Sequence, residues 1–298
     1  MMRALILGGS GMLGHKLCQT FAGRFETFTT VRRPVSEFAR AGIFDSVHVI
    51  EDVEANDFDR VAKTIASIKP QVIINSIGIV KQDPAATDRL ASISINALFP
   101  HRLAQLSGAA GARLIHISTD CVFSGRKGNY SEDDKSDTDD LYGMTKYLGE
   151  IASPGCLTLR TSMIGRELAS SHGLVEWLLS QQGERIRGFK KAIFTGFTTE
   201  ALSRIIADLV EEHPKLEGIY HVTADPISKF DLLTLINQKR TLNIEIEPDE
   251  TFICDRSLNG TRFRAATNFV PPDWSDMVTD LVNDPTPYDV IRRSLIVS

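Results

Sequence analysis

Short apolar runs alternate with amphipathic segments through the first half of the chain. Arg3–Leu7 is apolar and runs into glycines, a pattern typical of a strand buried on both faces. Similar runs predict five more strands, at Phe25–Val31, Ser46–Ile50, Val72–Asn75, Arg113–Ser118 and Cys156–Arg160. Apolar residues at helical spacing predict intervening helices at His15–Phe21, Asp57–Ile68, Leu90–Ala110 and Tyr142–Ile151, the third interrupted or bent near Pro100. This alternation predicts an α/β fold with a doubly wound parallel sheet.

The rhythm changes after Arg160. Helices are predicted at Leu174–Gln181, Glu200–Glu212 and Lys229–Asn237, the last capped by Ser228, with a strand at Gly218–Val222. Beyond Ile244 the periodicity weakens and Asn, Asp, Pro and Arg become more frequent. We expect a main domain at residues 1–160, with 196–223 returning to it. Residues 161–195 and 224–298 are expected to form a smaller C-terminal lobe.

Composition narrows the class of protein. The 298 residues carry a net charge of -5 without a basic stripe, so nucleic acid is not an expected partner. The apolar run near the start is too short for a secretion signal, and we expect neither a membrane partner nor a membrane span. The four cysteines form no CxxC pair, so neither a metal site nor a disulfide framework is expected. These features predict a cytoplasmic protein.

Three glycines follow the first predicted strand in the pattern G-x-x-G-x-x-G, at Gly8, Gly11 and Gly14. Gly8 would permit a tight turn, Gly11 a close approach of the backbone to a pyrophosphate, and Gly14 close packing of helix on strand. The following helix would offer free N–H groups to phosphates. Glycines also serve plain turns, but a strand before and a helix after favour a Rossmann dinucleotide site, to which Ser10 also belongs.

The end of the second predicted strand indicates which dinucleotide binds. An acidic residue there would bind the ribose hydroxyls of NAD, but this chain has Arg32 and Arg33. Guanidinium groups can pair with a 2′-phosphate, so the two arginines favour NADP(H). The alternative is that both arginines are solvated surface charges. Asp52 and Val53 follow the third predicted strand, where Asp52 could accept a hydrogen bond from adenine or form a solvated turn.

Tyr142 and Lys146 are four residues apart, which places both side chains on one face of a helix. A nearby cation favours the phenolate, so we expect Lys146 to lower the pKa of Tyr142 from its ordinary value of about 10. Tyr142 could then exchange a proton with a carbonyl oxygen as a hydride is transferred. The preceding predicted strand ends at Ser118 and Thr119, where a hydroxyl could polarise the same carbonyl.

These anchors together resemble the extended short-chain dehydrogenase/reductase family. GGSGMLG at residues 8–14, STDCVFSG at 118–125 and YGMTK at 142–146 occur in the family's order. NSIGIVKQDP at 75–84, LRTSMIG at 159–165 and GIYHV at 218–222 make the chain most similar to dTDP-4-dehydrorhamnose reductases and other RmlD-like sugar-nucleotide reductases. The resemblance implies an NADP(H)-binding domain and a substrate-binding C-terminal lobe. It also implies a possible homodimer, as in other members of the family.

The resemblance also implies roles for individual residues. Thr119 would be the hydroxyl member of the catalytic set, Tyr142 the acid/base and Lys146 its partner and a ligand of the nicotinamide ribose, while Asn96 would support the active-site region. Other family positions would lie along the cofactor: Met12 and Leu13 over its pyrophosphate, and Asn75, Ser76 and Ile77 beside them. The reaction implied is reduction of a 4-keto group on a nucleotide-linked deoxysugar by NADPH, for surface polysaccharide or glycan synthesis.

Some positions depart from the family pattern. Met163 stands where these reductases usually have a tryptophan that contacts the sugar, so the substrate could differ. Lys81, Asp83 and Arg256 are candidates to contact the substrate or its diphosphate, although Lys81 and Arg256 could equally be exposed structural residues. Cys121 lies close to Thr119 in the sequence. We interpret Cys121 as a small buried residue that fills space and not as a nucleophile.

Two other functions compete with a reductase. A sugar-nucleotide epimerase or dehydratase would use the same scaffold, but Arg32, Arg33 and the lack of a glutamate after Asp120 disfavour it. A noncatalytic NADP-binding regulatory subunit, as occurs among RmlD-like chains, would have no need of the pair Tyr142 and Lys146.

Overall fold

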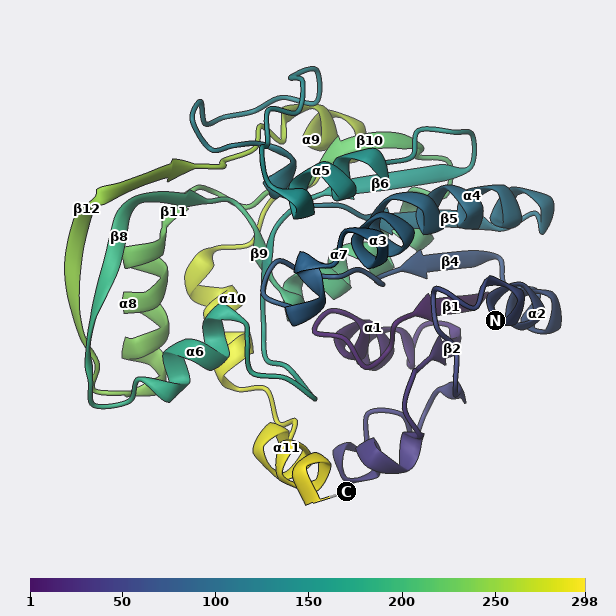
Figure 1. Ribbon diagram of the computed structural model, residues 1–298, viewed down its shortest axis with the longest axis horizontal. Coiled ribbons are helices and arrows are strands. Elements are labelled where there is room, and N and C mark those ends of the chain that lie inside the picture. The colour runs from purple at the N-terminus through teal and green to yellow at the C-terminus, as the bar shows by residue number, and fades with distance from the viewer. Residues whose placement is uncertain (298) are drawn as a thin grey trace.

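A central parallel sheet organises the structure (Figure 1). The computed structural model describes residues 1–297, apart from the side chains at 39–41, 84 and 294–297. The strand order is β10-β6-β5-β4-β1-β2-β3, and every neighbouring pair is parallel. The strands are β1 Arg3–Leu7, β2 Glu26–Thr30, β3 His48–Ile50, β4 Val72–Asn75, β5 Arg113–Ile117, β6 Cys156–Arg160 and β10 Gly218–His221. The predicted doubly wound sheet is confirmed, and its order reverses between β1 and β4, where such sheets bind ligands.

Helices cover both faces of this sheet. Alternate residues of β1 point to opposite sides: Ala4 and Ile6 belong to the core cluster that includes residues of α1 (Gly14–Phe21) and α7 (Thr199–Glu212). Leu5 and Leu7 belong to the cluster formed with α2 (Phe58–Ile68) and α4 (Phe99–Ala109). Because both faces are buried, the central strands β1 and β4 are apolar at most positions, whereas β2 buries threonines, so the continuous apolar runs are those of the central strands.

The long helix predicted at Leu90–Ala110 is interrupted, as expected. It consists of α3 (Arg89–Ser92), a π-helical segment η3 (Ile93–Leu98) and α4. The irregular segment lies against the end of α5 (Leu141–Leu148), where a Cβ atom on Gly149 would be 1.9 Å from the carbonyl oxygen of Asn96. Close approach of this helix, and not Pro100 alone, therefore accompanies the break.

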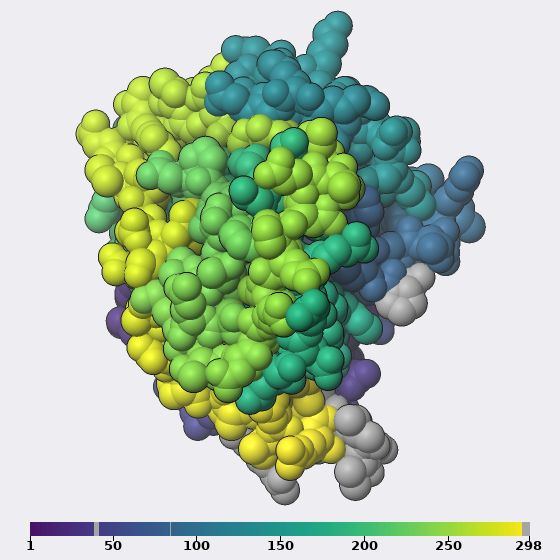
Figure 2. Space-filling model, turned by 90° about the vertical axis from the view of Figure 1, so that its left-hand side faces the viewer, coloured from purple at the N-terminus to yellow at the C-terminus, as the bar shows by residue number. Residues whose placement is uncertain are grey.

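The later segments form a second layer beside the sheet, and they make up most of the face in green and yellow in Figure 2. A three-stranded sheet, β11-β8-β12, packs against α8, with the small pair β7 and β9 nearby. These elements are β7 Met163–Ile164, α6 Leu174–Ser180, β8 Arg185–Phe194, β9 Phe197–Thr198, β11 Ile227–Ser228, α8 Lys229–Arg240, β12 Glu245–Asp255, α9 Thr261–Thr267, α10 Trp274–Val282 and α11 Tyr288–Val297. β10 lies in the central sheet beside β6, and α7 contacts α1. The division of the chain into two domains stays a prediction.

Two long strands of this layer were not predicted. The inward positions of β8 include Gly188 and Ala192, which give little hydrophobic signal. Its outward positions carry Arg185 and Arg187, which form ion pairs with acidic residues of β12. The predicted cap of α8 is present, because the Ser228 hydroxyl accepts a hydrogen bond from the Asp231 N–H at 3.0 Å.

A buried ion pair joins the end of α5 to the sheet. The guanidinium of Arg160, at the end of β6, forms two hydrogen bonds of 2.7 Å with the carboxylate of Glu150, just after α5. Both side chains are at most 4% exposed. The Ser118 hydroxyl donates to the same carboxylate at 2.7 Å, and Arg160 also contacts His221 of β10 at 3.2 Å. One carboxylate thus connects α5 with the ends of β5 and β6.

We expect Glu150→Gln to lower the free energy of unfolding by about 3–5 kcal/mol, because it leaves the Arg160 charge buried without its partner. Urea unfolding followed by circular dichroism measures this change. Glu245→Gln is the matched control, since it breaks an exposed pair with Arg185 and should cost about 0–1 kcal/mol. Equal losses in the two variants would contradict the assignment.

Candidate active site

The glycine loop has the geometry that the sequence predicts. Gly8 has φ +89°, a left-handed conformation that favours glycine, and a Cβ atom on Gly14 would lie 2.0 Å from the Gly8 carbonyl oxygen. Gly11 is exposed at the start of α1, and Ser10 and Met12 are partly exposed beside it. The side chain of Leu13 is buried in the core, so only its backbone could face a ligand. Gly9 was not among the predicted residues, and a Cβ atom on it would lie 2.0 Å from the Thr29 hydroxyl oxygen of β2.

The ends of β2 and β3 lie side by side next to this loop. Val53 is buried, and its N–H donates to the Val31 carbonyl at 3.2 Å. This bond brings Asp52, exposed with φ +57°, close to the segment that carries Arg32 and Arg33. Both arginines are exposed, and Arg33 pairs with Glu37 at 3.4 Å. The predicted adenosine-binding residues are therefore gathered at one edge of the sheet.

The segment after β4 lines the other side of the glycine loop. The Ser76 hydroxyl donates to the Leu7 carbonyl at 2.6 Å, and a Cβ atom on Gly8 would be 3.1 Å from Ile77. The side chain of Asn75 is fully buried. Its amide nitrogen contacts His116 Nδ1 at 3.0 Å and its amide oxygen accepts the Ile77 N–H. Asn75 thus shapes this segment without directing its side chain outward.

Thr119 and Tyr142 meet at the carboxyl end of β5. Tyr142 lies in the first turn of α5, within hydrogen-bonding reach of the Thr119 hydroxyl, which lowers its pKa. Burial has the larger effect, and with the nearby Cys121 sulfur it raises the pKa of Tyr142. The direction is opposite to the lowering expected from Lys146, so that expectation is wrong. A protonated tyrosine at neutral pH is a proton donor rather than a base.

Lys146 lies on the same helix face, beneath the site. Its ammonium donates to the Ile117 carbonyl at 2.7 Å. Burial lowers the pKa of Lys146 to about 8, and Glu150 opposes this change. A Cβ atom on Gly78 would lie 3.9 Å from the ammonium nitrogen, so a glycine leaves the space beside it open.

Asn96 connects the segment after β4 to α5. Its side-chain amide exchanges two hydrogen bonds of 2.9 Å with the backbone of Ile79. It also contacts the Thr145 hydroxyl of α5 at 3.4 Å. These contacts fit a residue that positions the site, and among the described side chains no hydrogen bond joins Asn96 to Tyr142 or Thr119.

The C-terminal part of the chain brings cations toward Thr119. Arg256 donates from Nε to the Phe123 carbonyl at 2.9 Å. Its positive charge acts to lower the pKa of Asp120 and that of Cys121. Lys229, at the start of α8, interacts electrostatically with the same two residues. Its ammonium nitrogen lies 4.2 Å from the centre of the Phe194 ring. From the sequence, Lys229 was predicted only as the start of a helix, because nothing local links it to residues about a hundred positions earlier.

The other candidate substrate residues have different surroundings. Lys81 pairs at 2.7 Å with Asp140, the residue that caps the N-terminus of α5. Asp83 caps a short 3-10 turn through the Ala85 N–H. Met163 is partly exposed in β7, paired with Phe197 of β9. Cys121 has its pKa raised to about 12, first by burial and then by Asp120, which agrees with a filler and not a nucleophile.

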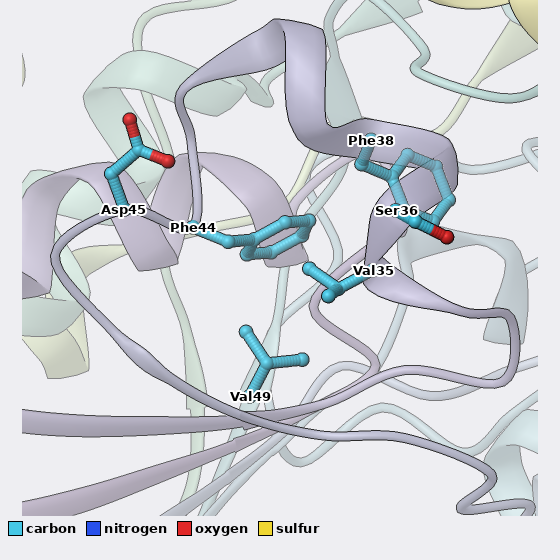
Figure 3. Close-up of a pocket in the computed structure, with 6 residues that line it drawn as sticks. All are labelled: Val35, Ser36, Phe38, Phe44, Asp45 and Val49. Carbon is cyan, nitrogen blue, oxygen red and sulfur yellow. The ribbon is translucent and has the colours of Figure 1, made fainter.

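A hollow of about 300 Å³ lies elsewhere, between η1 (Val35–Ala41) and β3 (Figure 3). Val35, Phe44 and Val49 face one another there, while the Asp45 carboxylate points away from them. Its lining carries no cation, so it is unsuited to a phosphate-bearing ligand. Among the described residues, no three side chains gather as a metal site, and no helix has the length and apolar character to span a membrane.

Comparisons with known proteins agree with the predicted resemblance. The profile of the RmlD substrate binding domain family matches residues 2–286. A dTDP-4-dehydrorhamnose reductase of Aggregatibacter actinomycetemcomitans is 26% identical, over 92% of this chain and 96% of that protein. A hypothetical dTDP-4-dehydrorhamnose reductase from Sulfolobus tokodaii superposes with a TM-score of 0.76 at 27% identity, covering 92% of this chain and 98% of that one. The same enzyme of Bacillus anthracis, in complex with NADP, superposes at 0.75 with 23% identity over 94% and 98% of the two chains, which shows a shared fold. The chain therefore belongs to the RmlD substrate binding domain family.

Proposed function

We propose that this chain is an NADPH-dependent reductase of a 4-keto group on a nucleotide-activated deoxysugar, acting in surface polysaccharide or glycan synthesis. The observation that carries this proposal is the meeting of Thr119 and a protonated Tyr142, with Lys146 on the same helix. Relatives named dTDP-4-dehydrorhamnose reductase support the substrate class. The four described cysteines are free, which is consistent with a cytoplasmic enzyme.

The residues present fit a dinucleotide phosphate. The absence of a Cβ at Gly14 allows α1 to start directly against the loop, so its N–H groups face outward beyond Gly11. Arg32 and Arg33 are exposed at the end of β2, and a 2′-phosphate would satisfy their guanidinium groups. We propose that Asp52 and Val53 border the adenine, and that Ser76 and Ile77 lie along the pyrophosphate.

The protein's own residues would handle the proton. NADPH supplies a hydride to the carbonyl carbon when it is bound. Tyr142 donates its phenolic proton to the carbonyl oxygen, so one O–H bond breaks and one forms on the sugar. The Thr119 hydroxyl, which donates to the Asp120 carboxylate at 3.1 Å, would turn to donate to the same oxygen and stabilise the charge that develops there. Lys146, held at the Ile117 carbonyl, would stabilise the phenolate that remains and bind the nicotinamide ribose.

We propose that the sugar nucleotide lies between these groups and the C-terminal lobe formed by residues 161–195 and 224–298. Arg256 and Lys229 offer positive charge from that lobe. Met163 offers an adaptable apolar contact to the sugar. Lys81 is already paired with Asp140, the residue that caps α5. Any effect of Lys81 on the substrate would therefore act through the position of α5.

The first test is oxidation of NADPH by the purified chain with a panel of nucleotide-linked 4-keto-6-deoxyhexoses, with NADH in parallel. We expect turnover with NADPH that Tyr142→Phe reduces by at least about a hundredfold, the usual contribution of a general acid, while NADPH affinity is retained. Epimerised sugar without net oxidation of NADPH would indicate the epimerase alternative. Tight NADPH binding, no turnover and an unchanged Tyr142→Phe variant would favour a noncatalytic subunit.

The charge of Lys146 predicts the pH dependence. The pKa of Lys146 is lowered to about 8, so the side chain is protonated below that pH and loses its charge as the pH rises through it. We expect kcat/KM for NADPH to fall above about pH 8. Lys146→Arg is the matched variant, because arginine keeps its charge and should remove this decline. The same decline in both variants would show that another group causes it.

We propose that the chain forms a homodimer through a face of α3, η3 and α5. Large apolar side chains are exposed on these three touching segments: Leu90, Ile93, Leu98, Met144, Tyr147 and Leu148. A patch of this kind on one surface is typical of a protein interface. A second copy of the chain would cover it on both partners at once.

Leu148→Glu should raise the dissociation constant of the dimer at least about tenfold, because a charge would be buried at the interface. Analytical ultracentrifugation over a concentration series measures this constant. Val270→Glu is the control, since Val270 is an 81% exposed apolar residue outside that face. A wild-type chain that is monomeric at every concentration would overturn the dimer.

A further inference from the structure

A buried polar cluster outside the catalytic site connects the C-terminal segment to the glycine loop. His15, in the first turn of α1, is fully buried. Its Nδ1 lies 2.9 Å from the Gly11 carbonyl oxygen, and its Nε2 lies 2.9 Å from the Tyr288 hydroxyl. The ring therefore bridges the loop and a residue 273 positions further along the chain.

The direction of these hydrogen bonds follows from the chemistry of the partners. A carbonyl oxygen only accepts, so Nδ1 of His15 carries the hydrogen. Burial, with Lys16 adding to it, lowers the pKa of His15 to about 3, so the ring is neutral and Nε2, 2.9 Å from the Tyr288 oxygen, can only accept. The single Tyr288 proton lies between two acceptors, this nitrogen and the Asp284 carboxylate, which the Lys16 ammonium pairs at 2.6 Å.

The Gly11 carbonyl is held from one side by two donors. It accepts the His15 backbone N–H at 3.1 Å in addition to Nδ1 at 2.9 Å. A trans peptide group is planar, and its N–H points opposite to its C=O. Fixing the Gly11 carbonyl along α1 therefore fixes the Met12 N–H in the reverse direction, outward from the helix N-terminus, where an anion would bind.

The C-terminal segment is itself anchored to α1. Gln19 donates to the Thr286 hydroxyl at 3.0 Å, one turn further along α1 than His15. The Arg166 guanidinium lies 4.5 Å from the centre of the Tyr288 ring. The His15 and Tyr288 rings meet edge to face, with centroids 5.7 Å apart. Tyr288 lies just beyond residues 2–286, which the family profile matches.

We propose that His15 and Tyr288 are positioning residues that aim the Met12 N–H at the pyrophosphate of the bound dinucleotide. This inference rests on the proposed function, since it requires the glycine loop to bind NADP(H). The effect should be on cofactor affinity and not on proton transfer, because neither residue reaches Tyr142 through a described hydrogen bond.

Tyr288→Phe tests the bridge with little loss of packing. We expect the Kd for NADPH and for NADH to rise about five- to tenfold, the effect of losing one preorganising hydrogen bond. Turnover at saturating NADPH should change less than about twofold. The inhibition constant of 2′-AMP, which has no pyrophosphate, should stay unchanged. Tyr220→Phe, which removes a hydroxyl from β10, is the matched control.

Two substitutions at His15 separate positioning from packing. Asn places an N–H donor where His15 has Nδ1 but no atom where His15 has Nε2, so His15→Asn should raise the Kd no more than Tyr288→Phe does. His15→Leu fills the space without a donor and should show the five- to tenfold loss. Melting temperatures identify any variant that is merely unfolded.

The outcomes distinguish this inference from the proposed function. A wild-type chain that binds no NADP(H) would overturn both. Wild-type binding with an unchanged Kd in Tyr288→Phe and His15→Leu would overturn the positioning role alone. If the affinity for 2′-AMP fell as much as the affinity for NADPH, the positioning role would also be overturned, because the substitutions would then loosen the whole domain.

Discussion

The carboxylate of Glu150 is the point on which the arrangement of the active site depends. It binds Arg160 through both oxygens and accepts from Ser118, the residue before Thr119. Arg160 in turn contacts Nε2 of His221, whose Nδ1 bonds to the Tyr130 carbonyl. A carbonyl accepts only, so this ring donates from Nδ1 and accepts from the arginine. The ends of β5, β6 and β10 are thus connected beneath the helix that carries Tyr142.

Burial shapes the chemistry of the site more than the pairing of charges does. The same cause raises the pKa of Tyr142 and lowers that of Lys146, because both changes disfavour an ion in a poorly solvated place. The two pKa values therefore move apart, and Tyr142 holds its proton more tightly than Lys146 does. A protonated tyrosine beside a lysine whose pKa is lowered to about 8 suits delivery of a proton to a carbonyl, since below that pH the phenolate that remains has a cation available.

The sequence was sufficient where the structure depends on local pattern. Apolar runs and segments rich in β-branched and aromatic residues located all six strands of the first half, and the glycine spacing located the loop whose geometry Gly8 and Gly14 require. It was insufficient where a residue acts through a distant partner. Lys229 and Tyr288 look ordinary in sequence, and only the fold brings them to Asp120 and His15. The pKa of Tyr142 was misjudged for the same reason, because spacing reveals a neighbouring cation but not the extent of burial.

Positive charge is distributed along the proposed ligand path although the chain is acidic overall, with a net charge of -5. Arg32 and Arg33 lie at the adenosine end, Lys146 at the centre, and Lys229 and Arg256 face it from the C-terminal lobe. At physiological ionic strength charges are screened beyond about 8 Å, so a polyanionic ligand in the site responds to these nearby cations and hardly to the net charge. A path with cations at both ends and a proton donor between them would suit two phosphate-bearing molecules whose reactive ends meet at Tyr142. The cations come from opposite ends of the chain, so the fold has to form before such a path exists.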